Sequence, residues 1–538
     1  RAFRPPSHAS RQFACVAMAD TVGQPARRTS AAAAVALVGA SLLAACALLR
    51  RIAREEKRRK ARRGAEEPPM AVPSLPVLGN ALAYKADPAG FLERQRNDLG
   101  TTFSLNLAGL RMAVVAGRHE MAQVATAGEA VLSAQAATAD FGFGETLGEF
   151  NVYFGTDLHK VVLKSTGLAE LGSETCSTEL AAAIAIAVDA ALPLGQDGSH
   201  GSLRDMLDTM RRAMLHTVVL HLLGSGVLAA FNGPSGRHSR DFLSEFMVFQ
   251  DRVEDATTKG VALPSWLSRP LIWWPVRLRR WRLRRRLAEA VAAVWAPGSG
   301  REGGLWLDTL RRFESRAAIP AWAKFLRHRR GAAAAAAAVE KAGEKVSPEE
   351  AAELAIGLLF AAHKNPAIGA AQALMLLLEH PDELQKVLGD VRGRTSAVLG
   401  ADVSSGAALR CSVMEALRLT AHTIGGIRKI VAPDGFEMTQ ADGKRLHVPH
   451  GQYIVLCHTV PNRDAATWAE PMAFAPGRFS GPRAFDEYEF TTFSQGLHRC
   501  PGRNYALRLM ELMLAEMLRR FDFVAPKPLP GMSYEKAT

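Results

Sequence analysis

Cysteine is scarce in this chain and follows no pattern. Six cysteines occur among 538 residues, and none belongs to a CxxC pair. Their spacing excludes a regular disulfide framework and argues against a zinc site, so a reducing compartment is predicted. The six are Cys15, Cys46, Cys176, Cys411, Cys457 and Cys500.

Two other features are missing. The chain has no internal repeat, which excludes a solenoid or another repeat architecture. It also has no flavin or nicotinamide fingerprint, so electrons for a redox reaction would have to come from another protein. Length and composition suit one large domain with an N-terminal appendage. A low-complexity stretch at 331–346, with seven consecutive alanines, is predicted to be a connector.

The positive charge is concentrated rather than spread. The net charge is +13, and most of it lies in two stretches, 50–63 and 266–286. The second stretch also holds Trp266, Trp273, Trp274 and Trp281, and tryptophan with arginine suits a membrane interface. Because neither stretch belongs to a groove-reading motif, nucleic acid is not a predicted partner.

An uncharged run of 20 residues at 30–49 is just long enough to cross a bilayer. Nine basic residues follow it at once, so the positive-inside rule places everything downstream in the cytosol. The pattern predicts a tail at 1–29, a single transmembrane helix at 30–49 and a basic, proline-rich linker at 50–72. The alternative for this run is an alanine-rich helix on a protein surface, since nine of its residues are alanine.

The composition of the first 17 residues bears on the subcellular location of the protein. Residues 1–17 contain three arginines, two serines and no acid, a composition that resembles a transit peptide. Met18, however, is a plausible start that would leave a short lumenal tail before the anchor. The predicted location is therefore the endoplasmic reticulum membrane, with a plastid or mitochondrial membrane as the alternative.

A candidate cofactor-binding segment lies near the C-terminus, where residues 493–502 have the sequence FSQGLHRCPG. Gly496 and Gly502 let the backbone turn sharply and approach a flat cofactor. Apolar spacing over 504–520 predicts a helix, so Cys500 lies just before a helix N-terminus, where we expect a lowered thiol pKa. A thiolate ligand of haem needs this setting. The plainer alternative is an ordinary buried cysteine.

Four positions of this loop resemble the haem-binding signature of the cytochrome P-450 superfamily. Three other segments resemble further motifs of that family in its own order. The signature residues are Phe493, Gly496, Cys500 and Gly502, and the segments are Glu415–Arg418, Phe474–Phe479 and Pro73–Gly79. The resemblance implies the P-450 fold, mainly α with small β-sheets (α+β), over a catalytic domain at 73–538. It also implies haem b with Cys500 as axial ligand of the iron. The pattern is mostly helical, with strand-like stretches at 102–115 and 445–456.

The Glu415-Ala-Leu-Arg418 segment places a carboxylate and a guanidinium on one helical face, where they can pair. Taken alone, such a pair is more often a solvated surface pair. The resemblance implies instead a buried cluster of Glu415, Arg418 and Arg478 that locks the loop carrying Cys500.

Haem carries two propionates, which require cations. The resemblance places basic residues at His498 and Arg428, and further propionate contacts at Lys160 and Lys164. For the two lysines a solvated helix face is the alternative, because the family's usual Trp and Arg pair is absent there.

A buried helix is predicted from Ser347, where an N-cap, a proline and a capping-box glutamate occur together. In its middle, Ala362 belongs to the family's small pair, Lys364 replaces an acid, and Asn365 replaces a threonine that helps to deliver protons. An amide donates a hydrogen bond but relays protons poorly. Pro366 predicts a local break above the haem. The alternative is a register slip in which His363 or Lys364 faces solvent near a kink.

The amide at Asn365 and the segment Cys500–Arg503 resemble the branch that contains bile-acid-type sterol hydroxylases and prostacyclin synthase. The segments Leu105–Gly109 and Phe493–Cys500 look, less specifically, like those of sterol 14-demethylases. The prediction is a membrane-bound monooxygenase of a sterol or related lipid, which uses O2 and electrons from an NADPH-dependent reductase. Arg499, Arg503 and Arg508 are candidate docking residues for that reductase. The alternatives are an NADPH-independent lipid peroxide isomerase or dehydratase and a haem-binding sensor without turnover.

Overall fold

The computed structural model describes residues 65–76, 78–148, 174–192, 205–233, 241–261, 265–311, 346–394, 407–421, 424–481 and 483–524. Lys160, Lys164, the predicted helix at 30–49 and nearly all of the connector lie outside these residues. The chain divides into two compact units, Arg1–Ala65 and Glu66–Thr538. The described residues belong almost entirely to the second unit.

The larger sheet has five strands in the order β1-β2-β7-β4-β3. Among the described strands of this sheet, β2 and β7 are the one parallel pair, with Val114 opposite Val455. The smaller sheet is the antiparallel pair β5–β6. The strands are β1 (Thr102–Leu107), β2 (Leu110–Val115), β3 (Leu132–Ser133), β4 (Ile424–Ile430), β5 (Phe436–Thr439), β6 (Arg445–Val448) and β7 (Tyr453–Cys457).

Both predicted strand stretches are confirmed, each with an interruption. Residues 102–115 form the β1–β2 hairpin, whose turn places Ala108 and Gly109 at φ 53° and 97°. Residues 445–456 form two strands in different sheets, because Pro449 lacks an N–H for the ladder and Gly451 has a positive φ.

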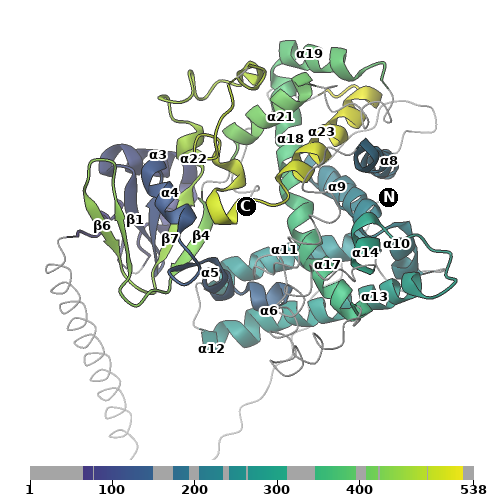
Figure 1. Cartoon of the computed structure of the whole chain (residues 1–538), viewed down its shortest axis with the longest axis horizontal. Helices are drawn as coiled ribbons and strands as arrows, with labels where there is room; N and C mark the ends of the chain where they lie inside the picture. Colours follow the sequence, from purple (N-terminus) through teal and green to yellow (C-terminus); the bar gives the residue numbers. More distant parts are fainter. Residues whose placement is uncertain are drawn as a thin grey trace, which may run out of the picture. The chain divides into compact units, whose positions relative to one another are not determined.

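Helices make up most of the described chain, as Figure 1 shows, which confirms the predicted class of a mainly helical protein with small sheets. The helices that matter for the site are α4 (Arg118–Thr126), α9 (Met206–Leu222), α11 (Phe242–Val261), α13 (Trp274–Trp295), α17 (Pro348–Ala362), α18 (Lys364–Glu379), α19 (Pro381–Val391), α21 (Ala407–Leu419) and α23 (Arg503–Arg520). The others are α2 (Ala81–Ala86), α3 (Pro88–Leu99), α5 (Ala134–Asp140), α6 (Phe143–Leu147), α8 (Glu174–Ala191), α10 (Ser225–Asn232), α12 (Ser265–Ser268), the π-helix η2 (Arg269–Trp273), α14 (Leu305–Arg311), α22 (Thr459–Asn462) and the 3-10 turns η4 (Pro476–Phe479), η5 (Thr491–Phe493) and η6 (Gly496–His498).

The predicted start and break of the long buried helix are both confirmed. Ser347 and Glu350 form a capping box in which each backbone N–H donates to the other side chain, at 3.0 and 3.2 Å. Helix α17 ends at Ala362 and α18 begins at Lys364. The interruption follows from Pro366, which has no N–H to donate to the carbonyl of Ala362.

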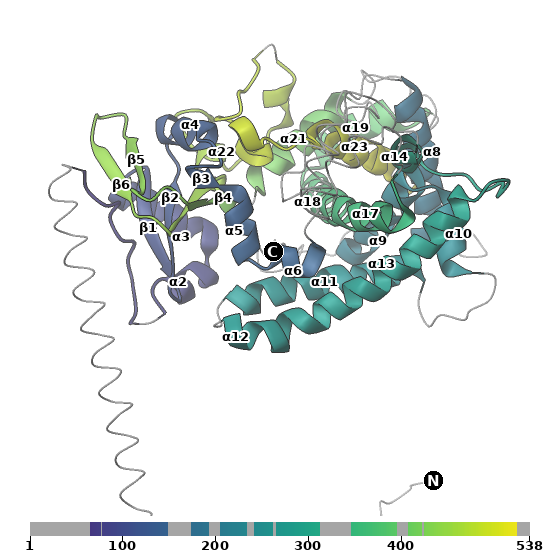
Figure 2. The ribbon, with the colours of Figure 1, turned by 60° about the horizontal axis from the view of Figure 1, so that its bottom comes forward.

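The main hydrophobic core lies among α9, α17, α18, α21 and α23. Gly369 lets α18 approach two neighbours, because a Cβ there would lie 2.9 Å from both Leu417 of α21 and Met510 of α23. Helices α11 and α13 lie side by side beneath α17 and α18 in the view of Figure 2. Among the described helices, none is by itself long and apolar enough to cross a membrane, and α9 with α10 passes that test only as a pair bent by 112°.

Candidate functional site

The loop of Cys500 runs from η5 to the start of α23. The Cys500 N–H donates to the Phe493 carbonyl at 2.8 Å, which closes the loop on itself. Gly496 has φ 62°, and a Cβ there would lie 2.4 Å from the carbonyl oxygen of Ala125. The close packing of α4 on the loop therefore requires glycine at this position.

The Cys500 thiol is exposed to solvent, yet the surrounding protein desolvates it. Burial raises the pKa of the thiol above its ordinary value, against smaller lowering effects from the Gly502 N–H and the charge of Arg503. The expected lowering of the thiol pKa at the helix N-terminus is therefore wrong for the protein chain, because desolvation is the larger effect.

Ser494, inside the same loop, carries backbone strain. Its φ of 57° and ψ of 178° lie in a region that glycine occupies and other residues avoid. We expect Ser494→Gly to raise the free energy of unfolding by about 1 kcal/mol, measured from the midpoint of urea unfolding of the intact protein.

Ser480→Gly is the matched control, because Ser480 has φ −88° and also follows a 3-10 turn. Glycine there should destabilise the protein by about 0.5–1 kcal/mol. Equal shifts in both variants would contradict the strain at Ser494.

Two predicted cations, Arg428 and His498, come together around Glu129. The Arg428 side chain is buried on β4, and its Nη1 donates to the Ile427 carbonyl at 2.9 Å. Its Nη2 is buried and has no hydrogen-bond partner among the residues that the structure describes. Burial lowers the pKa of Arg428 to about 10, and Glu129 opposes that shift. His498 Nε2 lies 3.3 Å from Glu129 Oε1.

Arg428 also lies beside the cysteine loop. A Cβ on Gly426 would lie 3.0 Å from Arg428 Nη1 and 3.3 Å from Ser494 Oγ. The Ser494 hydroxyl, like Arg428 Nη2, is buried and finds no hydrogen-bond partner within the described part of the chain. These unused donors converge at a position that suits an anionic group of a ligand.

The break between α17 and α18 holds the second group of predicted residues. His363 is completely buried, and its Nδ1 lies 2.8 Å from the Leu359 carbonyl. Burial lowers the His363 pKa to about 4, so the ring is neutral at pH 7. Lys364 is mostly buried and forms an ion pair with Glu254 of α11. The alternative that either residue simply faces solvent is therefore wrong.

The small residue Ala362 is half-buried, and Asn365 is exposed. Both belong to the broken helix that packs on α23, the helix that follows Cys500. The role of Asn365 at an oxygen site stays a prediction.

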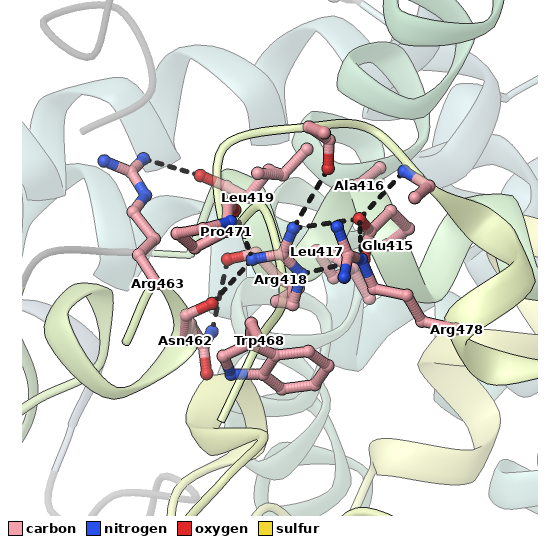
Figure 3. A network of polar contacts seen from close by, with 12 residues as sticks. Glu415, Ala416, Leu417, Arg418, Leu419, Asn462, Arg463, Trp468, Pro471 and Arg478 are labelled. Carbon is pink, nitrogen blue, oxygen red and sulfur yellow. Dashed lines mark hydrogen bonds and ion pairs between the residues drawn. The ribbon is translucent and has the colours of Figure 1, made fainter. Parts of the chain in front are cut away.

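Glu415, Arg418 and Arg478 lie together, as Figure 3 shows. Glu415 and Arg418 are completely buried and form two hydrogen bonds of 2.8 Å. Arg478 Nε donates to Glu415 Oε1 at 3.2 Å. The same oxygen also accepts from Arg418 Nη2 and from the Ala475 N–H at 3.0 Å, so among the described residues Oε1 has three donors and Oε2 has one.

A chain of hydrogen bonds connects this cluster to the cysteine loop. Arg418 Nη1 donates to the Asn462 carbonyl at 2.7 Å. Asn462 Oδ1 in turn accepts from the Thr491 N–H at 2.8 Å, at the first residue of η5. Figure 3 shows Asn462 beside Arg418, whose guanidinium lies over the ring of Trp468, 5.0 Å from the ring centroid. The cluster therefore holds the segment from which the loop of Cys500 begins.

The prediction that Arg508 is a docking residue on the surface is wrong. Arg508 is buried on α23 and pairs with Glu511 at 3.5 Å, so it does not contribute to a docking face. Arg499 is exposed and lies 3.4 Å from Glu487, and Arg503 lies over the ring of Phe493 at 5.6 Å.

The sequence model of the cytochrome P450 family matches residues 320–537, a range that includes the broken helix, the buried cluster and the cysteine loop. This part of the chain belongs to the cytochrome P450 family. It is 30% identical over 187 residues to a putative cytochrome P450 137 of Mycobacterium tuberculosis, which covers 34% of this chain and 35% of that protein.

Two plant proteins are similar over comparable spans. The flavonoid-6-hydroxylase of Mentha piperita is 30% identical over 159 residues, 28% of this chain and 30% of that protein. The geraniol 8-hydroxylase of Swertia mussotii is 25% identical over 214 residues, 37% of this chain and 42% of that protein. The chain spans about a third of the length of the first curated relatives it matches, 35% for the mycobacterial protein.

Family membership implies a haem with an axial thiolate, and the residues present fit that group. Cys500 offers an accessible thiol, and a Cβ on Gly502 would stay 4.0 Å from its sulfur. Arg428 offers a buried guanidinium with an unused donor, which fits a propionate. When bound, a haem-thiolate supplies the chemistry of O–O cleavage.

Sequence reasoning missed several residues that shape the site. Glu129 and Glu254 each contact a predicted residue through their side chains, and Asn462 contacts Arg418 through its carbonyl, but none lies near its partner in the sequence. No local signal identifies them. Ser494 was recognisable only by its position inside the signature, since its strain depends on the folded loop.

Proposed function

We propose that this protein is a haem-thiolate monooxygenase that hydroxylates an apolar small molecule, with electrons from a separate NADPH-dependent reductase. The observation that carries the proposal is the accessible thiol of Cys500 in a loop held by a buried cluster, in a chain of the cytochrome P450 family. The similar plant proteins are named as hydroxylases of a flavonoid and of geraniol.

A sterol or related lipid is the narrower hypothesis for the substrate. It rests on Asn365 and on the Cys500–Arg503 segment, and the names of the similar proteins do not point to a sterol. The observation that favours the second candidate, a lipid peroxide isomerase or dehydratase, is also Asn365. An amide in place of a threonine hydroxyl is a poor proton relay, and a peroxide substrate brings its own oxygen.

We also propose that the protein acts at a membrane, first of all the endoplasmic reticulum, with a plastid or mitochondrial membrane as the alternative. Besides the sequence at 30–49, an exposed apolar row on η2 and α13 supports this. Its members Leu271, Trp274, Leu278 and Trp281 are 63%, 66%, 42% and 47% exposed and recur at helical spacing. Arginines flank them, which suits an interface with anionic lipid.

The testing experiment is turnover by membranes that contain the full chain. Sterols, smaller terpenoid alcohols and a lipid endoperoxide are offered with and without NADPH and a reductase. Product that requires both NADPH and reductase is the expected result. Consumption of the endoperoxide without NADPH would overturn the monooxygenase and favour the isomerase.

A further inference from the structure

The first residue after the helix break, Lys364, is bound by a carboxylate of another helix. Its Nζ forms an ion pair with Glu254 Oε2 of α11, and the two side chains are 12% and 30% exposed. The other oxygen of Glu254 accepts from Gln250 Nε2 at 3.3 Å, one turn earlier on α11. Gln250 is buried, so the carboxylate is held in place from its own helix.

The residue before Lys364 also contacts α11. The His363 ring meets the ring of Phe246 edge to face, with centroids 5.7 Å apart. Phe246 and Glu254 are eight residues apart on α11, a little over two turns, so they lie toward the same side of that helix. Two consecutive residues of the break are thus attached to α11, one by an apolar contact and one by charge.

Helix α17 makes a similar charged contact with α13, but here the carboxylate belongs to the broken helix and the cations belong to its neighbour. Glu353 of α17 is buried and lies 3.3 Å from Arg280 and 3.7 Å from Arg284, both on α13. Arg286 of α13 in turn pairs with Glu245 of α11. Helices α11 and α13, which lie together in Figure 2, are therefore bound by charge to the two halves of the broken helix and to each other.

We propose that Glu254 is a positioning residue: through Lys364 it couples the position of α11 to the conformation of the break that presents Asn365. When α11 moves away, Lys364 loses its counter-charge while it remains mostly buried. An unpaired, partly desolvated cation is costly, unlike a broken surface pair. Motion of α11 thus changes both the local charge and the backbone beside Asn365. This inference rests on the proposed function only for the role of Asn365.

The test measures amide hydrogen exchange of the full-length, haem-loaded protein in three variants. Glu254→Gln removes the counter-charge, and Glu254→Lys with Lys364→Glu reverses the pair. Asp255→Asn is the matched control, because Asp255 pairs with Lys259 on the exposed side of the same helix. A second readout is the fraction of NADPH electrons that is recovered in product.

For Glu254→Gln we expect exchange about tenfold faster than wild type at both the C-terminal half of α11 and the first turn of α18. The reversed pair should restore slow exchange, and Asp255→Asn should leave α18 unchanged. Faster exchange in α11 alone, or no recovery in the reversed pair, would overturn the coupling. Exchange does not depend on turnover, so a protein that proves to be an isomerase can still pass or fail this test.

Discussion

Glu415→Ala is expected to yield a protein that does not retain haem. The substitution leaves the fully buried guanidinium of Arg418 without its carboxylate and removes the acceptor of Arg478 Nε. Breaking a buried pair from one side costs about 3–5 kcal/mol, a large share of the stability of a domain. The change also loosens Asn462 and, through it, the Thr491 N–H from which the cysteine loop begins. Haem content per polypeptide, from the Soret band and a pyridine haemochrome assay, gives the result.

Glu383→Ala is the control for this prediction. Glu383 also pairs with a basic residue three positions later, Lys386 at 2.7 Å, but the lysine is 63% exposed. We expect a change of at most about 0.5 kcal/mol and full haem content. Full haem content in Glu415→Ala would show that the cluster does not hold the loop.

Cys500→Ser is expected to abolish turnover while the protein stays folded. The Cys500 side chain is exposed in the structure, so the change leaves no cavity in the core. A serine hydroxyl does not supply the electron-rich sulfur that favours O–O cleavage. Turnover should fall to background. The red-shifted Soret band of the reduced, carbon monoxide-bound protein, which reports thiolate ligation, should be lost.

Cys411→Ala provides the matched control. Cys411 is a free and mainly buried cysteine on α21, and burial raises the pKa of its thiol. Its replacement should leave the carbon monoxide spectrum unchanged and cost only stability. If Cys500→Ser kept the thiolate spectrum, the ligand would be another residue.

The interactions that could be predicted are those between residues close together in the sequence. The capping box of Ser347 and Glu350, the interruption before Pro366 and the i,i+3 pair of Glu415 and Arg418 each depend on one or two helical turns. Backbone geometry alone places such residues side by side. The family signature then identified which of the local patterns belongs to a haem protein.

Burial explains why two predictions at ionisable groups, Cys500 and Arg508, were wrong. The helix start after Cys500 is real, but desolvation of the thiol outweighs it in the protein chain and raises the pKa. The sequence pattern predicted a surface position for Arg508. In the structure its side chain is buried on α23 and pairs with Glu511. Desolvation depends on everything packed around a group, which no local pattern contains.

The sequence by itself determined the helical class, the break in the long helix and the cysteine loop, because glycine, proline and short-range spacing act within a few residues. Only the tertiary structure decided that Lys364 meets Glu254, that Glu129 lies beside His498 and that Asn462 connects Arg418 to Thr491. These partners come from helices and loops that the core brings together, and their charges interact strongly because that packing excludes water.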